Sequence, residues 1–222
     1  MGALTEDLPK PMLPVQDKPL LEHVLDHLRA AGIRSCGLIT GYKREVIERH
    51  FASYPMEIAF IHQSVINGTG GAAKLAQGFV GDESFLMAYG DIWCEPADYR
   101  AVMQPVECEP DTEATLAVKV VDDPFQGAAV YTRDGYIARI VEKPPKGTST
   151  THYNSAGIYC FRASVFDEID RIPLSPRGEY EITSAVEQMI EAGKKLRAVV
   201  LQGMWRDIGR PEDLAVADKF TA

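Results

Sequence analysis

Ser84-Phe85-Leu86-Met87-Ala88-Tyr89-Gly90-Asp91 is the stretch that decides the fold. A short apolar run that ends on turn residues is typical of a strand buried on both faces of a sheet. In an open α/β sheet, ligands bind in the crevice beyond the carboxyl ends of such strands. Gly90 lets the backbone approach a ligand closely, and Asp91 offers a hard oxygen to a cation. Considered alone, Asp91 is better explained as a turn or helix cap, so the rest of the chain must decide.

Length and charge narrow the class of protein. The 222 residues fit a single α/β domain, 1–222. No apolar run could span a bilayer and no basic-then-apolar leader is present, so we expect a cytoplasmic protein with no membrane partner. The net charge of −9 argues against nucleic acid as a partner. The four cysteines form no C-x-x-C pair, which indicates reduced thiols rather than a zinc site.

The first part of the chain alternates helical and strand patterns, which predicts a doubly wound sheet. A helix is predicted at 18–31, a turn followed by a helix at 41–51, and strands at 36–40 and 57–62. His23 and His27 have the i,i+4 spacing of a metal pair, but no third ligand is in view. Because they fall off the apolar stripe, we expect them on a solvated helix face.

Two other segments of this part have an unusual composition. Leu8-Pro9-Lys10-Pro11-Met12-Leu13-Pro14 carries three prolines, which predict extended structure without a helix and hold Lys10 on a stiff segment. Gln63-Ser64-Val65-Ile66-Asn67-Gly68-Thr69-Gly70-Gly71 is a glycine-rich turn before a small-residue helix. Backbone N–H groups in such a turn can receive an anion. A close crossing of a helix over a sheet would require small residues equally well.

After Asp91 the pattern changes to strands separated by turns. Arg133-Asp134-Gly135 is a hairpin signal, so an antiparallel or mixed lobe is expected to follow the parallel part. The predicted strands are 114–121, 128–132, 136–142, 155–161 and 196–201, with a helix at 179–193 and another beginning at Pro211. Glu142-Lys143-Pro144 ends one strand and Tyr153-Asn154-Ser155 opens the next, which places Glu, Lys and Asn at one edge.

Six motifs in order resemble those of the sugar-1-phosphate nucleotidylyltransferases, also called NDP-sugar pyrophosphorylases. They are LPKPMLP (8–14), NGTGG (67–71), YGD (89–91), EKP (142–144), NSAG (154–157) and WRDIG (205–209). The resemblance covers nearly the whole chain. It implies a glycosyltransferase-A-like (Rossmann-like) α/β fold, with a mixed, mainly parallel sheet flanked by helices and a small antiparallel lobe. It also implies that NTP and sugar 1-phosphate give NDP-sugar and pyrophosphate with Mg²⁺.

The resemblance also implies roles for individual residues. Asp91 and Asp207 correspond to the two Mg²⁺ carboxylates, and Lys10 to the lysine that meets the triphosphate. The nucleotide-binding positions are Gln63, Gly68, Thr69 and Gly90, so the family assigns the glycine-rich turn to the nucleobase rather than to phosphate. The sugar-phosphate positions are Glu142, Lys143, Asn154 and Glu179, with Lys143 on the phosphate.

These residue types suit the implied chemistry. A sugar-phosphate oxygen attacks the α-phosphorus in line, so the enzyme mainly positions its reactants and offsets their charge. Mg²⁺ prefers one or two carboxylates plus substrate oxygens. No general base is needed, because the attacking phosphate is already ionised.

The opening of the chain departs from the family pattern. The family begins with a strand and a glycine-rich loop just ahead of the Pro-Lys-Pro segment, and this chain starts after that point. We expect a start codon placed too late or a truncated product. The chain as written is therefore expected to have weak activity or none.

Three functions compete on the sequence alone: a nucleotidylyltransferase, a catalytically silent relative and a phosphohydrolase. A catalytically silent, nucleotide-sugar-binding regulatory relative would be expected to lose the carboxylates or lysines, but Lys10, Asp91, Lys143 and Asp207 all remain. A Mg²⁺-dependent phosphohydrolase would need a nucleophilic Asp or a base beside a water, and neither is seen.

The substrates are less well defined by the sequence. Gln63 mildly favours UTP or dTTP, whereas the NGTGGA loop is similar to that of guanylyl-transferring relatives. The sugar stays open, and a homo-oligomer is compatible with the sequence.

Overall fold

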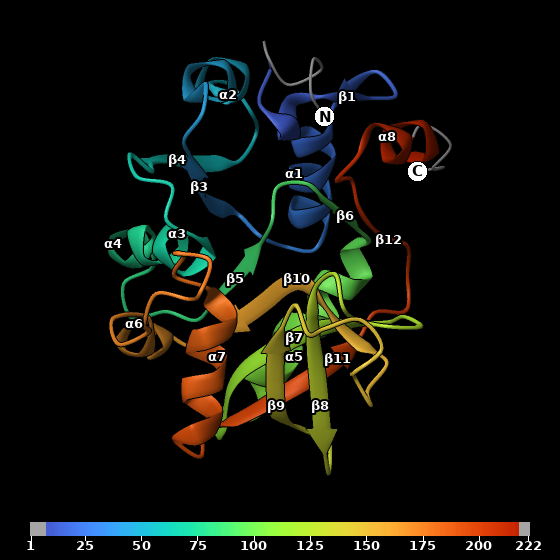
Figure 1. Cartoon of the computed structure of the whole chain (residues 1–222). Helices are drawn as coiled ribbons and strands as arrows, with labels where there is room; N and C mark the ends of the chain where they lie inside the picture. The colour runs from blue at the N-terminus through green and yellow to red at the C-terminus, as the bar shows by residue number, and fades with distance from the viewer. Residues whose placement is uncertain (1–7, 218–222) are drawn as a thin grey trace. The chain divides into compact units, whose positions relative to one another are not determined.

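The computed structural model describes residues 8–217 as two compact units (Figure 1). The first unit comprises residues 8–64, 89–100 and 203–217, and the second comprises residues 65–88 and 101–202. Residues 1–7 and 218–222, the two ends of the predicted 1–222 domain, lie outside the described part. Within residues 8–217, no helix is long and apolar enough to cross a membrane.

The first unit contains the predicted strand–helix alternation. The elements are α1 (Leu20–Ala30), β3 (Ser35–Thr40), α2 (Arg44–Phe51) and β4 (Glu57–His62), and β3 pairs with β4 in parallel. The apolar residues of α1 recur on one face, and that whole face is buried. Lys18 and Pro19, predicted as the start of this helix, instead form β2 (Lys18–Pro19), which pairs with β1 (Pro14–Val15). Pro19 has an extended ψ of 144°, so the helix begins after it.

The prediction for the two histidines of α1 is wrong. His23 is buried, with 6% of its surface exposed, and His27 is half-buried. Both rings contact Trp93 on β6 (Ile92–Cys94), with centroid distances of 4.8 Å and 5.0 Å. A strand from much later in the sequence therefore covers this part of α1.

The proline-rich segment also differs from its prediction. Lys10–Met12 forms one turn of 3₁₀ helix, η2, between extended residues Pro9 and Leu13. The turn needs only two bonds, from Met12 N to Pro9 O (2.8 Å) and from Leu13 N to Lys10 O (3.1 Å). Both donors lie outside the proline rings, so three prolines do not forbid this turn.

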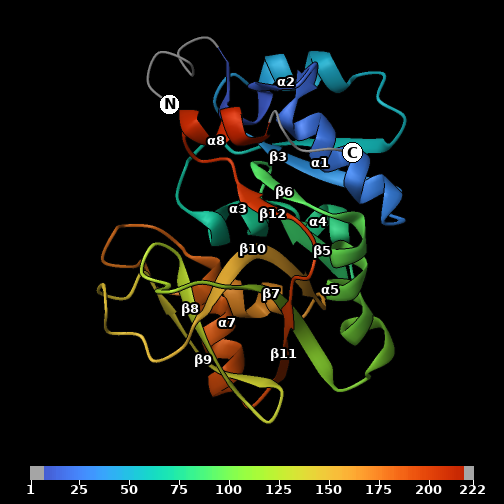
Figure 2. The same ribbon diagram turned by 90° about the vertical axis from the view of Figure 1, so that its right-hand side faces the viewer.

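The rest of the first unit is a short antiparallel pair and a helix. β6 pairs with β12 (Trp205–Asp207), as Figure 2 shows, and α8 (Pro211–Ala217) follows. Val15, Leu20, Trp93 and Ile208 form a buried cluster with Ala217 from α8. Helix α5 (Pro96–Cys108) leaves this unit after residue 100 and continues into the second.

The second unit is built on a six-stranded mixed sheet of order β5-β10-β7-β11-β9-β8. Its strands are β5 (Phe85–Ala88), β7 (Thr112–Val120), β8 (Ala128–Arg133), β9 (Tyr136–Glu142), β10 (Tyr153–Phe161) and β11 (Lys195–Val200). β7 and β11 pair in parallel, and the other pairs in this sheet are antiparallel. The mixed α/β class is confirmed. This sheet, however, has more antiparallel pairs than we expected from the sequence, which predicted a mainly parallel sheet with a small antiparallel lobe.

The stretch 84–91 is less buried than its apolar pattern suggests. β5 stands at one end of the described strand order, pairs with β10, and has four half-buried residues. The predicted hairpin at 133–135 is present: Asp134 and Gly135 have φ of 53° and 80°, as a type I′ turn requires.

Helices cover the second sheet. α7 (Ile182–Glu191) lies alongside β9 and contacts α3 (Thr69–Leu75) and α6 (Val165–Ile169) (Figure 1). α4 (Gln77–Val80) follows α3 along the chain and leads toward β5. Two predicted site residues lie at the ends of these elements: Glu142 is the last residue of β9, and Glu179 lies three residues before α7.

Candidate active site

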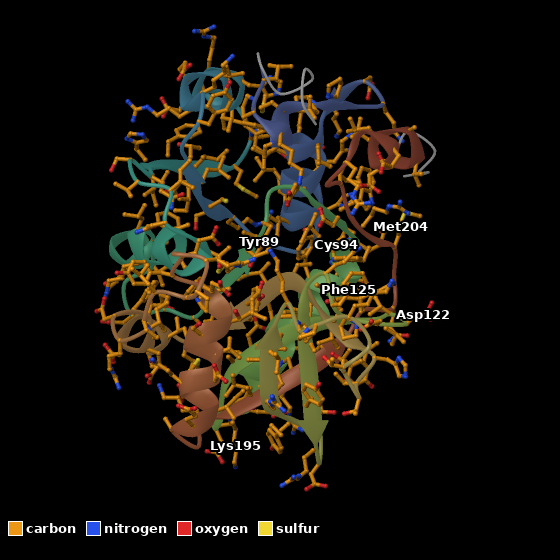
Figure 3. All side chains as sticks on the ribbon, viewed as in Figure 1. Tyr89, Cys94, Asp122, Phe125, Lys195 and Met204 are labelled. Carbon is orange, nitrogen blue, oxygen red and sulfur yellow. The ribbon has the colours of Figure 1, made fainter. Side chains whose placement is uncertain are left out.

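The first unit brings Lys10, Asp91 and Asp207 together. Lys10 Nζ donates a hydrogen bond to Asp91 Oδ2 and lies 3.9 Å from Asp207 Oδ1. Asp91 directly precedes β6, in the stretch between Tyr89 and Cys94 that Figure 3 labels. Asp207 ends β12 and stands opposite Ile92 in the ladder. Because the two strands run antiparallel, the end of one meets the start of the other, and the two carboxylates share one lysine.

Backbone bonds fix the two aspartates further. Ile208 N donates to Asp91 O at 2.9 Å, so each aspartate is held at the backbone next to the other. Gly90 packs on this arrangement, since a Cβ at its position would lie 3.4 Å from Leu21 Cδ1 and 3.7 Å from Pro11 Cγ. Gly90 therefore lies against the segment that carries Lys10.

The electrostatics of the cluster favour a cation. Partial burial raises the pKa of Asp207, and the neighbouring Asp91 carboxylate raises it further, while Lys10 opposes both effects. The Asp207 side chain keeps 58% exposure, so these effects are moderated by water. The negative charge of Asp91 that raises the pKa of Asp207 also attracts other cations to the pair.

The donor set fits Mg²⁺ rather than a softer metal. Two carboxylates with partial exposure are what Mg²⁺ takes from a protein when phosphate oxygens and water complete its shell. Within residues 8–217 no group of three or more His, Cys, Asp or Glu side chains could hold a metal ion. This excludes a protein-only cage in the described part but not a two-carboxylate site. The Lys10 ammonium already occupies a cationic position between the acids.

Gln63 is the remaining predicted site residue of the first unit. It directly follows β4, its backbone N donates to Thr40 O at 2.8 Å, and it is half-buried. Its proposed role at a nucleobase stays a prediction.

In the second unit, the glycine-rich turn forms a close crossing. Gly68 has φ of 105°, and a Cβ there would lie 2.4 Å from Tyr180 O. Tyr180 N donates to Asn67 O at 2.7 Å, and Gly70 N donates to Tyr180 O at 2.8 Å. Thr69 Oγ1 accepts a bond from Ile182 N at 3.0 Å. The small residues are thus needed because the extended segment before α7 lies directly against the turn.

Glu142 and Asn154 meet beside the first residues of β8. Glu142 pairs with Ala128 and Asn154 with Ala129, which confirms that the two motifs share an edge. Asn154 Nδ2 donates to Ser155 O at 2.8 Å, and Asn154 Oδ1 is buried without a hydrogen-bond partner among residues 8–217. That acceptor fits a ligand donor such as a hydroxyl.

Gly127 sets the geometry at this edge. Its carbonyl accepts a bond from Lys143 N at 2.7 Å, and a Cβ on it would lie 2.4 Å from Asn154 Oδ1. Asp122 and Phe125, labelled in Figure 3, lie on the same β7–β8 connection. Lys143 has φ of 43° and is exposed. This left-handed residue directly follows the end of β9.

Arg177 is the clearest site residue that the sequence analysis missed. Its guanidinium lies 3.0 Å from Glu181 Oε1, 3.4 Å from Glu179 Oε2 and 3.5 Å from Glu142 Oε1. Arg177 lies in a turn and is followed by Gly178 with φ of 75°, so no strand or helix period in the sequence relates its side chain to Glu179 and Glu181.

Burial and the nearby Glu181 carboxylate raise the pKa of Glu142. A bond from Thr183 Oγ1 (3.2 Å) and the charge of Arg177 oppose that rise. Arg177 thus joins three carboxylates into one cluster at the start of α7.

The sequence and structure comparisons identify the family. The Nucleotidyl transferase family model matches residues 2–222. A low-salt glycan biosynthesis nucleotidyltransferase, Agl11, of Haloferax volcanii is 35% identical over 98% of this chain and 61% of that protein. A bifunctional protein GlmU of Methanocaldococcus jannaschii is 35% identical over 98% of this chain and 50% of that protein. The chain thus spans 50–61% of the length of these relatives.

Solved structures agree with this fold. A Bacillus anthracis structure named as a glucose-1-phosphate thymidylyltransferase superposes with a TM-score of 0.87 at 25% identity, covering 98% of this chain and 88% of that one. A UDP-glucose pyrophosphorylase complexed with UDP-glucose gives a TM-score of 0.83 at 20% identity, covering 95% of this chain and 89% of that one. The fold is therefore glycosyltransferase-A-like, as predicted. The chain belongs to the nucleotidyl transferase family.

Proposed function

We propose that this chain transfers a nucleotidyl group from an NTP to a sugar 1-phosphate, releasing pyrophosphate. The observation that carries the proposal is the cluster of Lys10, Asp91 and Asp207, in a chain of this family. The two carboxylates provide a site for a cation. The lysine that bonds them can leave them and bind the phosphates of the nucleotide instead.

In this proposal the reaction is a substitution at phosphorus. An ionised oxygen of the sugar phosphate forms a bond to the α-phosphorus, and the bond from that phosphorus to the bridging oxygen breaks. Pyrophosphate leaves with the electron pair, and no proton is transferred. Asp91 and Asp207 would hold Mg²⁺, which supplies positive charge to the phosphate oxygens when bound.

The protein's own groups position the reactants. Lys10 is proposed to exchange its carboxylate partners for the triphosphate, because an ammonium is a point charge on a flexible chain. Lys143 would contact the sugar phosphate. Gln63, Gly68, Thr69 and Gly90 would contact the nucleotide.

Three acceptors would receive the sugar's hydroxyl groups. They are Glu142, Glu179 and the unpartnered Oδ1 of Asn154. Acceptors at fixed positions discriminate among sugars by which hydroxyls they can bond, since an unpaired buried acceptor costs about 1–3 kcal/mol.

The nucleobase is proposed to be uracil or thymine. Gln63 can bond the edge of a pyrimidine, and a Streptomyces griseus relative named glucose-1-phosphate thymidylyltransferase is 28% identical over 98% of this chain and 61% of that protein. A thermal-shift panel of four NTPs with Mg²⁺ tests this, because a ligand at about 100 times its Kd stabilises the folded state by about 2.7 kcal/mol.

The deciding experiment is pyrophosphate release with Mg²⁺, the NTP selected by that panel, and mixed sugar 1-phosphates. Release that needs both substrates supports the proposal. Release from NTP without sugar phosphate would indicate a hydrolase. Nucleotide-sugar binding without release, when the same assay is repeated on the chain preceded by the family's opening strand and glycine-rich loop, would indicate a regulatory relative.

A further inference from the structure

The two histidines of α1 both pack against the ring of Trp93. The His23 ring lies 4.8 Å from the Trp93 ring, tilted by 41°, and the His27 ring lies 5.0 Å away at 88°. Trp93 is 4% exposed. His23 and His27 are one helical turn apart, so they contact the indole as a pair.

Each histidine also binds a backbone carbonyl of a different strand. His27 Nδ1–H donates to Cys94 O at 2.8 Å, and His23 Nε2–H donates to Val15 O at 3.0 Å. The carbonyls can only accept, so these bonds fix which nitrogen carries hydrogen in each ring. His27 thereby ties α1 to β6, and His23 ties it to β1.

Trp93 connects this pair to the aspartates. It lies two residues after Asp91 on β6 and stands opposite Arg206 on β12, one residue before Asp207. Its ring belongs to the buried cluster that includes Ile208, the residue after Asp207. A displacement of Trp93 would therefore move both strand ends that carry the carboxylates.

We propose that His23 and His27 are positioning residues for the Asp91–Asp207 pair. By holding Trp93 against α1, they keep β6 and β12 in the register that places both carboxylates around one cation. This inference rests on the proposed function, in which that cation is Mg²⁺. Mg²⁺ requires near-octahedral ligands at about 2.0–2.1 Å, so a small shift of either strand costs affinity.

The alternative is that the histidines only fill the core. Core packing predicts lost stability with an unchanged cation site, whereas positioning predicts weaker cation binding in variants that remain folded. The two readings therefore differ in a measurement that does not depend on catalysis.

The experiment compares His27→Leu, which removes the donor, with His27→Asn, whose Nδ2 can replace Nδ1. His23→Leu and His23→Gln form the matching pair for Nε2. Mn²⁺ alone is the probe, and its dissociation constant is measured by electron paramagnetic resonance. Supporting residues behind a metal site typically change metal affinity by about 10–100-fold. We expect about tenfold weaker Mn²⁺ binding in His27→Leu and recovery in His27→Asn.

His50→Gln is the control. His50 is an exposed histidine of the same unit that bonds Glu22 at 2.7 Å and contacts Phe51. The His50→Gln variant should bind Mn²⁺ with the same affinity as the unmodified chain. The KM for sugar 1-phosphate, measured in parallel, should not change in His27→Leu.

Two outcomes would overturn the inference. One is unchanged Mn²⁺ affinity in His27→Leu at temperatures where circular dichroism shows it folded. The other, which applies if His27→Leu does not fold, is unchanged affinity in a folded His23→Leu variant. If Asp91→Asn leaves Mn²⁺ affinity unchanged, the proposed cation site itself fails. Weak binding in Asp91→Asn but not in the histidine variants removes the positioning role alone.

Discussion

Each of the two units gathers acidic side chains around one basic side chain, but the basic residue differs. In the first unit, Lys10 bonds Asp91 and reaches Asp207 at 3.9 Å. In the second, Arg177 lies within 3.5 Å of three glutamates. Lysine is a flexible point charge, whereas arginine is a planar fork with five donors. The first arrangement suits replacement of the lysine ammonium by another cation, and the second suits carboxylates that are held in place as hydrogen-bond acceptors.

The elements that carry the two clusters differ as well. Asp91 and Asp207 lie at paired strand ends backed by a buried tryptophan. Glu179 and Glu181 lie on an extended segment held against the glycine-rich turn. Changes behind the first cluster should therefore alter cation binding, and changes at the turn should alter sugar binding.

The largest expected effect is on the first cluster. Asp207→Asn removes a proposed Mg²⁺ ligand, and the expected loss of about 4 kcal/mol of transition-state stabilisation corresponds to about a thousandfold lower kcat/KM. Stability should not fall. Because the folded pKa of Asp207 is raised, ionisation of this group opposes folding at neutral pH, and stability is recovered as pH falls through that pKa. Pyrophosphate release and thermal melts measure both effects.

The matched control is Asp111→Asn. Asp111 bonds Lys195 at 3.0 Å with 78% of its side chain exposed, which makes it another acid–lysine pair. Its activity should match that of the unmodified chain. A thousandfold loss in Asp111→Asn, or none in Asp207→Asn, would remove the distinction between the first cluster and a surface ion pair.

The second prediction tests the crossing that supports the glutamate cluster. Gly68→Ala places a Cβ 2.4 Å from Tyr180 O at a φ of 105°. We expect a loss of about 3 kcal/mol from strain and overlap, and a melting temperature lower by about 10 °C. Gly193→Ala is the control, since Gly193 has φ of 73° with nothing within 4 Å of its Cβ position. Equal losses in the two variants would mean that backbone strain alone matters at Gly68.

The third prediction concerns Arg177. In Arg177→Gln, the three glutamates lose their shared cation, so the pKa of Glu142 should rise further above its usual value. We expect about tenfold higher KM for sugar 1-phosphate, greatest at low pH, with Mn²⁺ affinity unchanged. The ΔΔG is thus about 1.4 kcal/mol.

Arg171→Gln provides the comparison for Arg177→Gln. Arg171 pairs with Glu168 at 3.5 Å and is 64% exposed. Steady-state kinetics from acid to neutral pH would contradict the proposed role if both variants gave the same KM and the same pH profile.

The sequence predicted the first cluster better than the surroundings of either cluster. Lys10, Asp91 and Asp207 lie in motifs whose order identifies the family, so their convergence could be expected. The motifs did not reveal Arg177, because a lone arginine in a turn-rich segment resembles an ordinary surface charge. Its function as a partner depends on which strand ends beside it, and that is set by sheet order.

Burial was the least predictable property. The apolar run 84–88 gives the same pattern in a central strand and in the half-buried β5, because the covering elements come from elsewhere in the chain. His23 was expected on a solvated face because its helix, considered alone, puts it off the apolar stripe. Trp93, far along the sequence, is what buries it.

The smallest expected effect tests this buried histidine through pH. Burial lowers the pKa of His23 below 6.5, Lys18 and His27 lower it further, and the Val15 carbonyl and Asp26 oppose them. The unfolded chain then binds a proton more readily than the folded one, so stability is complete above pH 6.5 and declines as pH falls toward the folded pKa. His23→Gln keeps the Nε2 donor but cannot titrate, so its melting temperature should decline less between pH 7.5 and 5.5. The melting temperature of His50→Gln should change with pH as that of the unmodified chain does. Equal declines in all three proteins would show that protonation of His23 does not make stability depend on pH.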